Sequence, residues 1–158
     1  MKQKVYIETS IPSYYHEIRE DPESVAKRLW TKQWWDNHGQ KYELVTAPPV
    51  FDELERGNYP TKQETVTLID ELPLLAVNEE VIDIVNEYLK HHIMPNGPSG
   101  DALHLALASY YNCQFLLTWN CQHLANANKF EHIRHINTLL GLSIPILTTP
   151  FQLIQEDA

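Results

Sequence analysis

Short apolar runs rich in β-forming residues alternate along the chain with segments of helical length and helical apolar spacing. The strand-like runs are residues 5–7, 42–46, 74–76, 115–118 and 146–147. The helical segments are residues 24–37, 48–56, 62–71, 79–91, 101–108 and 130–140. Because helix-length crossovers join successive strands, this order predicts an α/β fold of three α/β/α layers around a mainly parallel central sheet.

Length and charge limit the organisation and the partners. The chain has 158 residues, 43% of them hydrophobic, which suits one well-packed core and leaves no room for two ordinary domains. We therefore expect a single domain over residues 1–158. The formal net charge is −9, from 12 Lys and Arg against 21 Asp and Glu. Broad neutralisation of phosphates needs the opposite sign, so any nucleic acid must be engaged locally, through metal.

Two further features bear on location. Cys113 and Cys121 are the two cysteines, and the first residues show no charged leader followed by an apolar segment. The longest apolar stretches have strand length, whereas a membrane span needs about 20 residues. We expect a cytoplasmic protein with reduced thiols and no membrane contact.

Polar residues follow the predicted strands where their carboxyl ends would meet. Glu8 follows the run at 5–7, Asn120 follows the run that ends at Thr118, and Asp101 begins the helix that precedes that run. Ser99 is the expected N-cap of that helix, after a loop over residues 94–100. Open parallel sheets place their sites beyond the carboxyl ends of the strands. Glu53, on the helix at 48–56, joins this edge if its apolar face turns inward.

A cluster of carboxylates favours a bound cation. Neighbouring negative charges would raise each other's pKa unless a positive ion lies among them, and hard oxygen ligands suit Mg²⁺ or Mn²⁺. Such an ion can lower the pKa of a coordinated water and offset charge on a phosphate. Phosphodiester hydrolysis is the expected chemistry.

Four segments resemble, in family order, the motifs of PIN domains. They are residues 5–10, residues 46–57, residues 101–106, and residues 117–120 followed by His123 and Leu124. The first has the hydrophobic-acid-Thr/Ser pattern, and the acids of the first three are Glu8, Glu53 and Asp101. The resemblance covers nearly the whole chain. It implies a PIN-like fold and a metal-dependent endoribonuclease that hydrolyses RNA, often the VapC-like toxin of a type II toxin–antitoxin pair.

The resemblance also implies roles for the residues. Glu8, Glu53 and Asp101 would bind Mg²⁺ or Mn²⁺, and Asn120 would complete or position the catalytic site. The hydroxyls of Ser10 and Thr118 are candidates for orienting the ligands. We expect one tightly held ion, with a second arriving with the substrate phosphate.

Two positions depart from the family pattern. The first acid is usually Asp and is Glu8 here, and the last motif often has Asp where this chain has Asn120. The additional methylene and the missing charge imply reduced activity. The alternative is therefore a catalytically weakened PIN-like module that binds nucleic acid or a protein. A phosphatase of another α/β family ranks low, because the chain has neither an Asp-x-Asp pair at residues 8–10 nor a GxxxxGK[ST] loop.

Several other side chains have two interpretations. Tyr14, His123 and Asn126 are possible RNA contacts, although Tyr14 could belong to the core and the other two could brace or cap local structure. His104, three residues after Asp101, could join a mixed His/carboxylate site or pack inside the domain.

An aromatic stripe raises the question of protein partners. Trp30, Trp34 and Trp35 lie on one helix and could form a groove for an antitoxin helix or a homodimer contact, with core packing as the default interpretation. A basic antitoxin would suit the acidic chain.

Overall fold

The computed structural model describes residues 1–93, 100–121 and 124–154. Its strands are β1 (Lys4–Ile7), β2 (Glu43–Val45), β3 (Phe115–Leu117) and β4 (Ile146–Thr148). Its α-helices are α1 (Ser10–Tyr15), α2 (Pro22–Asn37), α3 (Pro48–Arg56), α4 (Lys62–Ile69), α5 (Glu79–Lys90), α6 (Asp101–Tyr110) and α7 (Ala127–Leu139), and a short 3-10 turn, η1, covers Gly39–Lys41. Ser99, the rest of the predicted loop at 94–99, and His123 lie outside the described residues.

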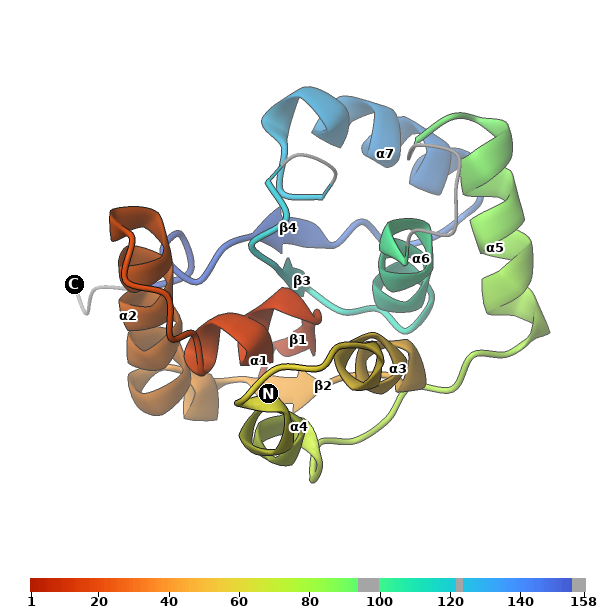
Figure 1. The fold of residues 1–158 in the computed structure, drawn as a ribbon. Helices are drawn as coiled ribbons and strands as arrows, with labels where there is room; N and C mark the ends of the chain where they lie inside the picture. The colour runs from red at the N-terminus through yellow and green to blue at the C-terminus, as the bar shows by residue number, and fades with distance from the viewer. Residues whose placement is uncertain (94–99, 122–123, 155–158) are drawn as a thin grey trace.

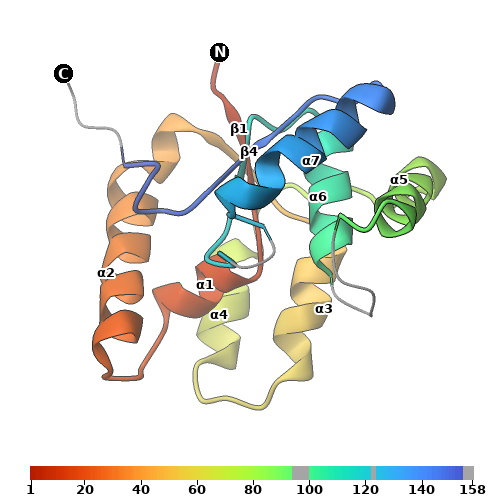
Figure 2. The ribbon, with the colours of Figure 1, turned by 90° about the horizontal axis from the view of Figure 1, so that it is seen from above.

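The four strands form one parallel sheet in the order β2-β1-β3-β4. Val5 on β1 pairs with Leu44 on one side and with Phe115 on the other, so β1 and β3 are the two central strands. Figures 1 and 2 show α2 on one side of the sheet and α5 and α6 on the other. The predicted three-layer α/β/α fold with a parallel sheet is therefore confirmed.

The central strands are buried on both faces, as expected for a covered parallel sheet. The residues of β3 are all buried, and so are Val5, Tyr6 and Ile7 of β1. Helix α6 lies close to the sheet because small side chains such as Ala102 and Ala106 are buried along it. The carboxyl ends of β1 and β3 thus meet at one edge of the sheet, beside the start of α6.

Two local predictions differ from the structure. Residues 10–15 form α1, which is not among the helical segments expected from the sequence. A proline is tolerated in the first helical turn, where its missing N–H has no partner in any case. Residues 74–76 do not form a full strand: Thr46 and Leu74 make one isolated parallel bridge, and Leu74 is 55% exposed. Because this run buries so little apolar surface, further strand pairing at residues 74–76 would add little stability.

The aromatic stripe on α2 is divided between core and surface. Trp34 is completely buried and stacks on Tyr42 with ring centroids 5.7 Å apart. Trp30 and Trp35 are partly buried and pack against the same core. Core packing is therefore the role of Trp34. In residues 1–93, 100–121 and 124–154, no helix combines the length and apolar character needed to cross a membrane.

Candidate metal centre

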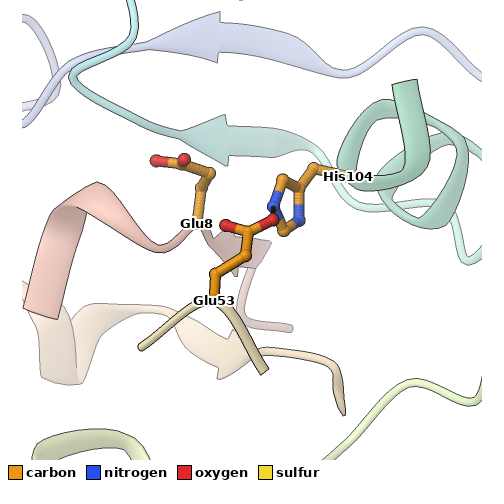
Figure 3. A group of neighbouring side chains, drawn as sticks. All are labelled: Glu8, Glu53 and His104. Carbon is orange, nitrogen blue, oxygen red and sulfur yellow. Dashed lines mark hydrogen bonds and ion pairs between the residues drawn. The ribbon is translucent and has the colours of Figure 1, made fainter. Parts of the chain in front are cut away.

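Side chains from three separate elements converge beyond the carboxyl ends of β1 and β3. Glu8 follows β1 directly, Glu53 lies on α3, and His104 lies on α6. One ligand atom from each lies within 4.8 Å of the other two, and Figure 3 shows the Glu53 carboxylate next to the His104 ring. The structure therefore brings together Glu8 and Glu53, as expected from their places in the sequence, and adds a histidine.

Glu8 is a buried carboxylate held by neutral donors. It is 6% exposed, and its Oε1 accepts hydrogen bonds from the Ser10 backbone N–H at 2.9 Å, from the Ser10 hydroxyl, and from the Thr118 hydroxyl at 2.8 Å. Both hydroxyls proposed to orient the ligands thus contact the same oxygen. Ser10 Oγ in turn accepts from the Trp119 N–H at 2.8 Å, which ties α1 to the end of β3.

Glu53 is held through both of its carboxylate oxygens. Thr9 Oγ1 donates to Oε2, and His104 Nε2 lies 2.9 Å from Oε1. Partial burial by itself would raise the pKa of Glu53, but the hydrogen bond and positive charge of His104, assisted by Thr9 and Arg56, outweigh burial and lower the pKa. Glu53 is therefore ionised at neutral pH.

His104 is completely enclosed and engaged on both ring nitrogens. It is 1% exposed, and its Nδ1 lies 2.7 Å from the hydroxyl of Tyr6, which is itself buried. Burial by itself would lower the pKa of His104, yet the hydrogen bond that His104 donates to Glu53 and the negative charges of Glu8, Glu53 and Asp101 raise it overall. The sequence offered one signal for His104, its position one helical turn after Asp101. It offered none for Tyr6, which looked like an ordinary core residue.

Asp101 and Asn120 form the adjoining part of the site. Asp101 is 9% exposed, and its Oδ1 accepts a hydrogen bond from Asn120 Nδ2 at 3.1 Å. The Asn120 N–H donates to Thr118 Oγ1 at 2.9 Å, and Thr118 in turn donates to Glu8. Asn120 thus links the first turn of α6 to the Glu8 carboxylate. Asp101 is not one of the three groups whose ligand atoms lie within 4.8 Å.

The donor set fits a hard divalent cation. A carboxylate oxygen of Glu8 lies within 4.8 Å of one of Glu53, and among the described residues no lysine or arginine forms an ion pair with Glu8. The negative charge of a buried carboxylate whose hydrogen-bond donors are all neutral is costly inside a protein. A cation that Glu8 and Glu53 hold, with water in its other positions, would compensate that charge.

A cavity of about 280 Å³ opens beside Glu53 between α3, α5 and α6. Val85 and Leu103 contribute apolar wall, and Arg56 lines the same cavity one helical turn after Glu53. The centre therefore borders a cavity that a substrate group could enter, and the positively charged Arg56 lines this cavity.

Tyr14 and Asn126, two of the predicted RNA contacts, have local structural roles. Tyr14 is partly buried, packs edge-on against Trp119 at 6.2 Å and lies under Lys27 Nζ at 5.2 Å. Asn126 caps α7, because its side chain accepts from the Asn128 N–H at 3.0 Å. A helix cap was the alternative interpretation of Asn126. An RNA contact by Asn126 stays a prediction.

Comparison with known proteins agrees with this geometry. No curated protein matches the chain. The model of the PIN domain matches residues 5–122, which span β1 to the end of β3 and contain Glu8, Glu53, Asp101 and Asn120. Because this match covers well over half of the chain, the protein belongs to the PIN-domain family, whose fold is that of metal-dependent nucleases.

Proposed function

We propose that the protein is a metal-dependent endoribonuclease that hydrolyses RNA phosphodiester bonds at the centre formed by Glu8, Glu53, Asp101 and Asn120. The observation that carries the proposal is Glu8: a carboxylate only 6% exposed, beside a second ionised carboxylate, with neutral donors for partners. The negative charges of these two carboxylates favour the binding of a divalent cation between them.

The residues divide the work between binding and positioning. Glu8, Glu53 and Asp101 would hold Mg²⁺ or Mn²⁺, directly or through water. A bound ion supplies an activated water and offsets charge on the phosphate oxygens. Ser10 and Thr118 keep Glu8 Oε1 in place, and Asn120 keeps Asp101 in place through its amide.

The RNA strand reaches the centre along the cavity between α3, α5 and α6. Arg56 is the positively charged residue that lines this cavity, and its charge is close enough to Glu53 to lower the pKa of that carboxylate. A single phosphate contact of this kind suits a chain with a net charge of −9, which cannot attract RNA by its overall field. Tyr14, with Lys27 above its ring, is a second candidate contact, as are His123 and Asn126.

The proposal extends to the biological setting. The protein would be a cytoplasmic, VapC-like toxin of a type II toxin–antitoxin module, built as one domain over residues 1–158. Both cysteines are free thiols, which suits a reducing compartment. A homodimer and a basic antitoxin would cover exposed apolar side chains around α2, where Leu29 and Phe151 are 57% and 54% exposed. Light scattering that finds monomers alone would contradict the dimer.

The test is cleavage of a mixed RNA pool with Mg²⁺, with Mn²⁺ and with EDTA. The native protein is compared with Asp101→Asn and Asn120→Asp, after circular dichroism has shown that all three are folded. We expect cleavage that requires the metal and disappears in Asp101→Asn. Metal-independent cleavage, or cleavage retained by Asp101→Asn, would contradict the proposal.

One observation favours a second function. Position 120 has an amide that donates to Asp101, whereas the PIN-domain pattern that the chain resembles often has Asp at this place. The protein could therefore be a weakened module that binds RNA or a protein partner with little hydrolysis. In that case the native chain binds RNA without cleaving it, and Asn120→Asp gains metal-dependent cleavage.

A further inference from the structure

His104 lies among the residues of the centre in a position that fits two different roles. Its Nε2 could bind the metal ion directly, since one nitrogen of its ring lies within 4.8 Å of carboxylate oxygens of Glu8 and Glu53. Alternatively, it could hold Glu53 in place and leave the ion to oxygen ligands. The hydrogen bonds around the ring decide between these roles.

Both nitrogens of His104 already have partners of fixed character. Nε2 is 2.9 Å from Glu53 Oε1, and an ionised carboxylate can only accept, so Nε2 must carry a proton. Nδ1 is 2.7 Å from the Tyr6 hydroxyl, which donates to a neutral ring and accepts from a charged one. In either state of the ring, Nε2 has no free lone pair for a metal ion.

The surroundings prevent the ring from exchanging these partners. His104 is 1% exposed and Tyr6 is completely buried, so water does not replace either bond. The Tyr6 and His104 rings also pack together, with centroids 5.6 Å apart. To bind a metal ion, Nε2 would have to release its proton and break the bond to Glu53. The ring proton would then lie on Nδ1, and the buried Tyr6 O–H would lose its acceptor.

We propose that His104 is a positioning residue, which holds the Glu53 carboxylate in place. The hydroxyl of Tyr6 keeps the His104 ring in this role, and the centre consequently binds its ion through oxygen atoms alone. The inference rests on the proposed metal centre and adds a basis for its choice of ion. Each Glu53 oxygen accepts one hydrogen bond, from His104 or from Thr9, and retains a lone pair for the ion. A set of oxygen ligands favours Mg²⁺ and Mn²⁺, whereas an added imidazole favours Zn²⁺.

Nitrogen-15 NMR of the histidine side chains tests the state of the ring directly. The signals of His104, one of eight histidines, are identified by their loss in His104→Gln. We expect a protonated Nε2 in the metal-free protein and the same protonated Nε2 at saturating Mg²⁺ or Zn²⁺. Loss of the Nε2 proton when either ion is added would overturn the proposal.

Titration calorimetry with Mn²⁺ and Zn²⁺ gives a second, independent readout. We expect His104→Ala to weaken both ions by a similar factor, about 10–100-fold, as is typical when a group that orients a ligand is removed. His104→Gln keeps an amide donor for Glu53 and should lose less. A loss confined to Zn²⁺ would identify His104 as a direct ligand and overturn the proposal.

Tyr6→Phe keeps the core filled and removes only the hydroxyl that commits the ring. We expect the affinity for Zn²⁺ relative to Mn²⁺ to rise about 10-fold or more, because Nδ1 no longer accepts from Tyr6 and can carry the ring proton in place of Nε2, which only in this variant is then free to bind metal. Tyr88→Phe is the matched control: Tyr88 is also completely buried, and its hydroxyl donates to Asn137 Oδ1 at 2.6 Å, a partner outside the metal centre. An unchanged ratio in Tyr6→Phe would count against the role of Tyr6.

The outcomes separate this inference from the proposed function. If the native protein binds neither ion, the proposed metal centre fails, while the NMR of the metal-free protein still shows whether Nε2 donates to Glu53. If ions bind and RNA is not cleaved, the nuclease fails and the role of His104 is decided by the calorimetry.

Discussion

Gly100 lies directly against the carboxylate of Glu53. A β-carbon at position 100 would overlap Glu53 Oε1 and would come within 3.2 Å of His104 Nε2. The backbone of Gly100 has φ −72°, a conformation open to any residue, so glycine is needed here for space and not for backbone freedom. The start of α6 can approach α3 this closely only because position 100 has no side chain.

Gly100→Ala should therefore weaken metal binding. The added methyl group displaces the Glu53 carboxylate, which is held by Thr9 and His104 and cannot move without breaking one of these bonds. We expect a loss of about 10–100-fold in Mn²⁺ affinity by calorimetry, comparable with the loss of a residue that orients a ligand. Gly39→Ala is the control, because its β-carbon would meet nothing closer than 3.7 Å. Equal affinities for the native protein and Gly100→Ala would show that Glu53 is not needed in its observed position.

Thr118→Val should disturb both Glu8 and Asn120. The completely buried Thr118 hydroxyl donates to Glu8 Oε1 at 2.8 Å and accepts from the Asn120 N–H at 2.9 Å. Valine has nearly the same shape but leaves these buried groups without a partner, so we expect unfolding by urea to become easier by about 1–3 kcal/mol.

A buried threonine away from the centre provides the comparison for Thr118. Thr65 is also completely buried, and its hydroxyl donates to the Thr61 carbonyl within the same helical region. Thr65→Val should leave Mn²⁺ affinity unchanged, whereas Thr118→Val should lower it. Similar affinities in the two variants would mean that Thr118 stabilises the fold without orienting Glu8.

The sequence predicted the sheet well because strand-forming runs and helical periodicity are local signals. The four strands and the edge at which Glu8 and Asn120 lie follow from the order of these runs along the chain. Helix α1 was missed because Pro12 resembles a helix breaker unless its place in the first turn is known. The run at 74–76 was assigned a strand because its apolar composition does not reveal how little of it is buried.

The contacts of the centre could be predicted only in part. A carboxylate at the end of a strand or at the start of a helix stands out against an apolar background, so Glu8 and Asp101 could be proposed from sequence. The pairing of Tyr6 with His104 could not, because it depends on how two core side chains from different elements meet in three dimensions. Thr9 was overlooked for the same reason, since its contact with Glu53 joins residues 44 positions apart.

In the metal-free protein, the Glu53–His104 pair should make stability depend on pH. The pKa of Glu53 is lowered from 4.5, so its contribution is fully present above about pH 4.5 and is lost as pH falls through the lowered value. The pKa of His104 is raised from 6.5, so its contribution is fully present below about pH 6.5 and is lost as pH rises through the raised value. The pair therefore stabilises the fold most between about pH 4.5 and pH 6.5.

Urea unfolding in EDTA from pH 4 to pH 9 measures this dependence. The difference in free energy of unfolding between the native protein and His104→Gln should be greatest between about pH 4.5 and 6.5 and should shrink toward pH 9. Glutamine retains a neutral amide, so the variant removes the titrating charge while keeping a polar side chain. A difference that stays constant across this range would show that the pair is not an ion pair.

Arg56→Gln should weaken RNA binding through the loss of one phosphate contact. Arg56 lines the cavity beside Glu53, and no ion pair of Arg56 with a described residue competes for its guanidinium. Fluorescence anisotropy with a labelled RNA in the Asp101→Asn background measures affinity without cleavage. Because each phosphate contact on a single strand releases a counterion, the slope of log K against log salt should fall in magnitude by about 0.7.

Arg134→Gln removes an equal charge from an exposed part of α7, where Arg134 lies 3.4 Å from Glu131, and should leave the slope unchanged. If the two variants behave alike, the effect of Arg56 is one of net charge, and the RNA does not pass through the cavity between α3, α5 and α6.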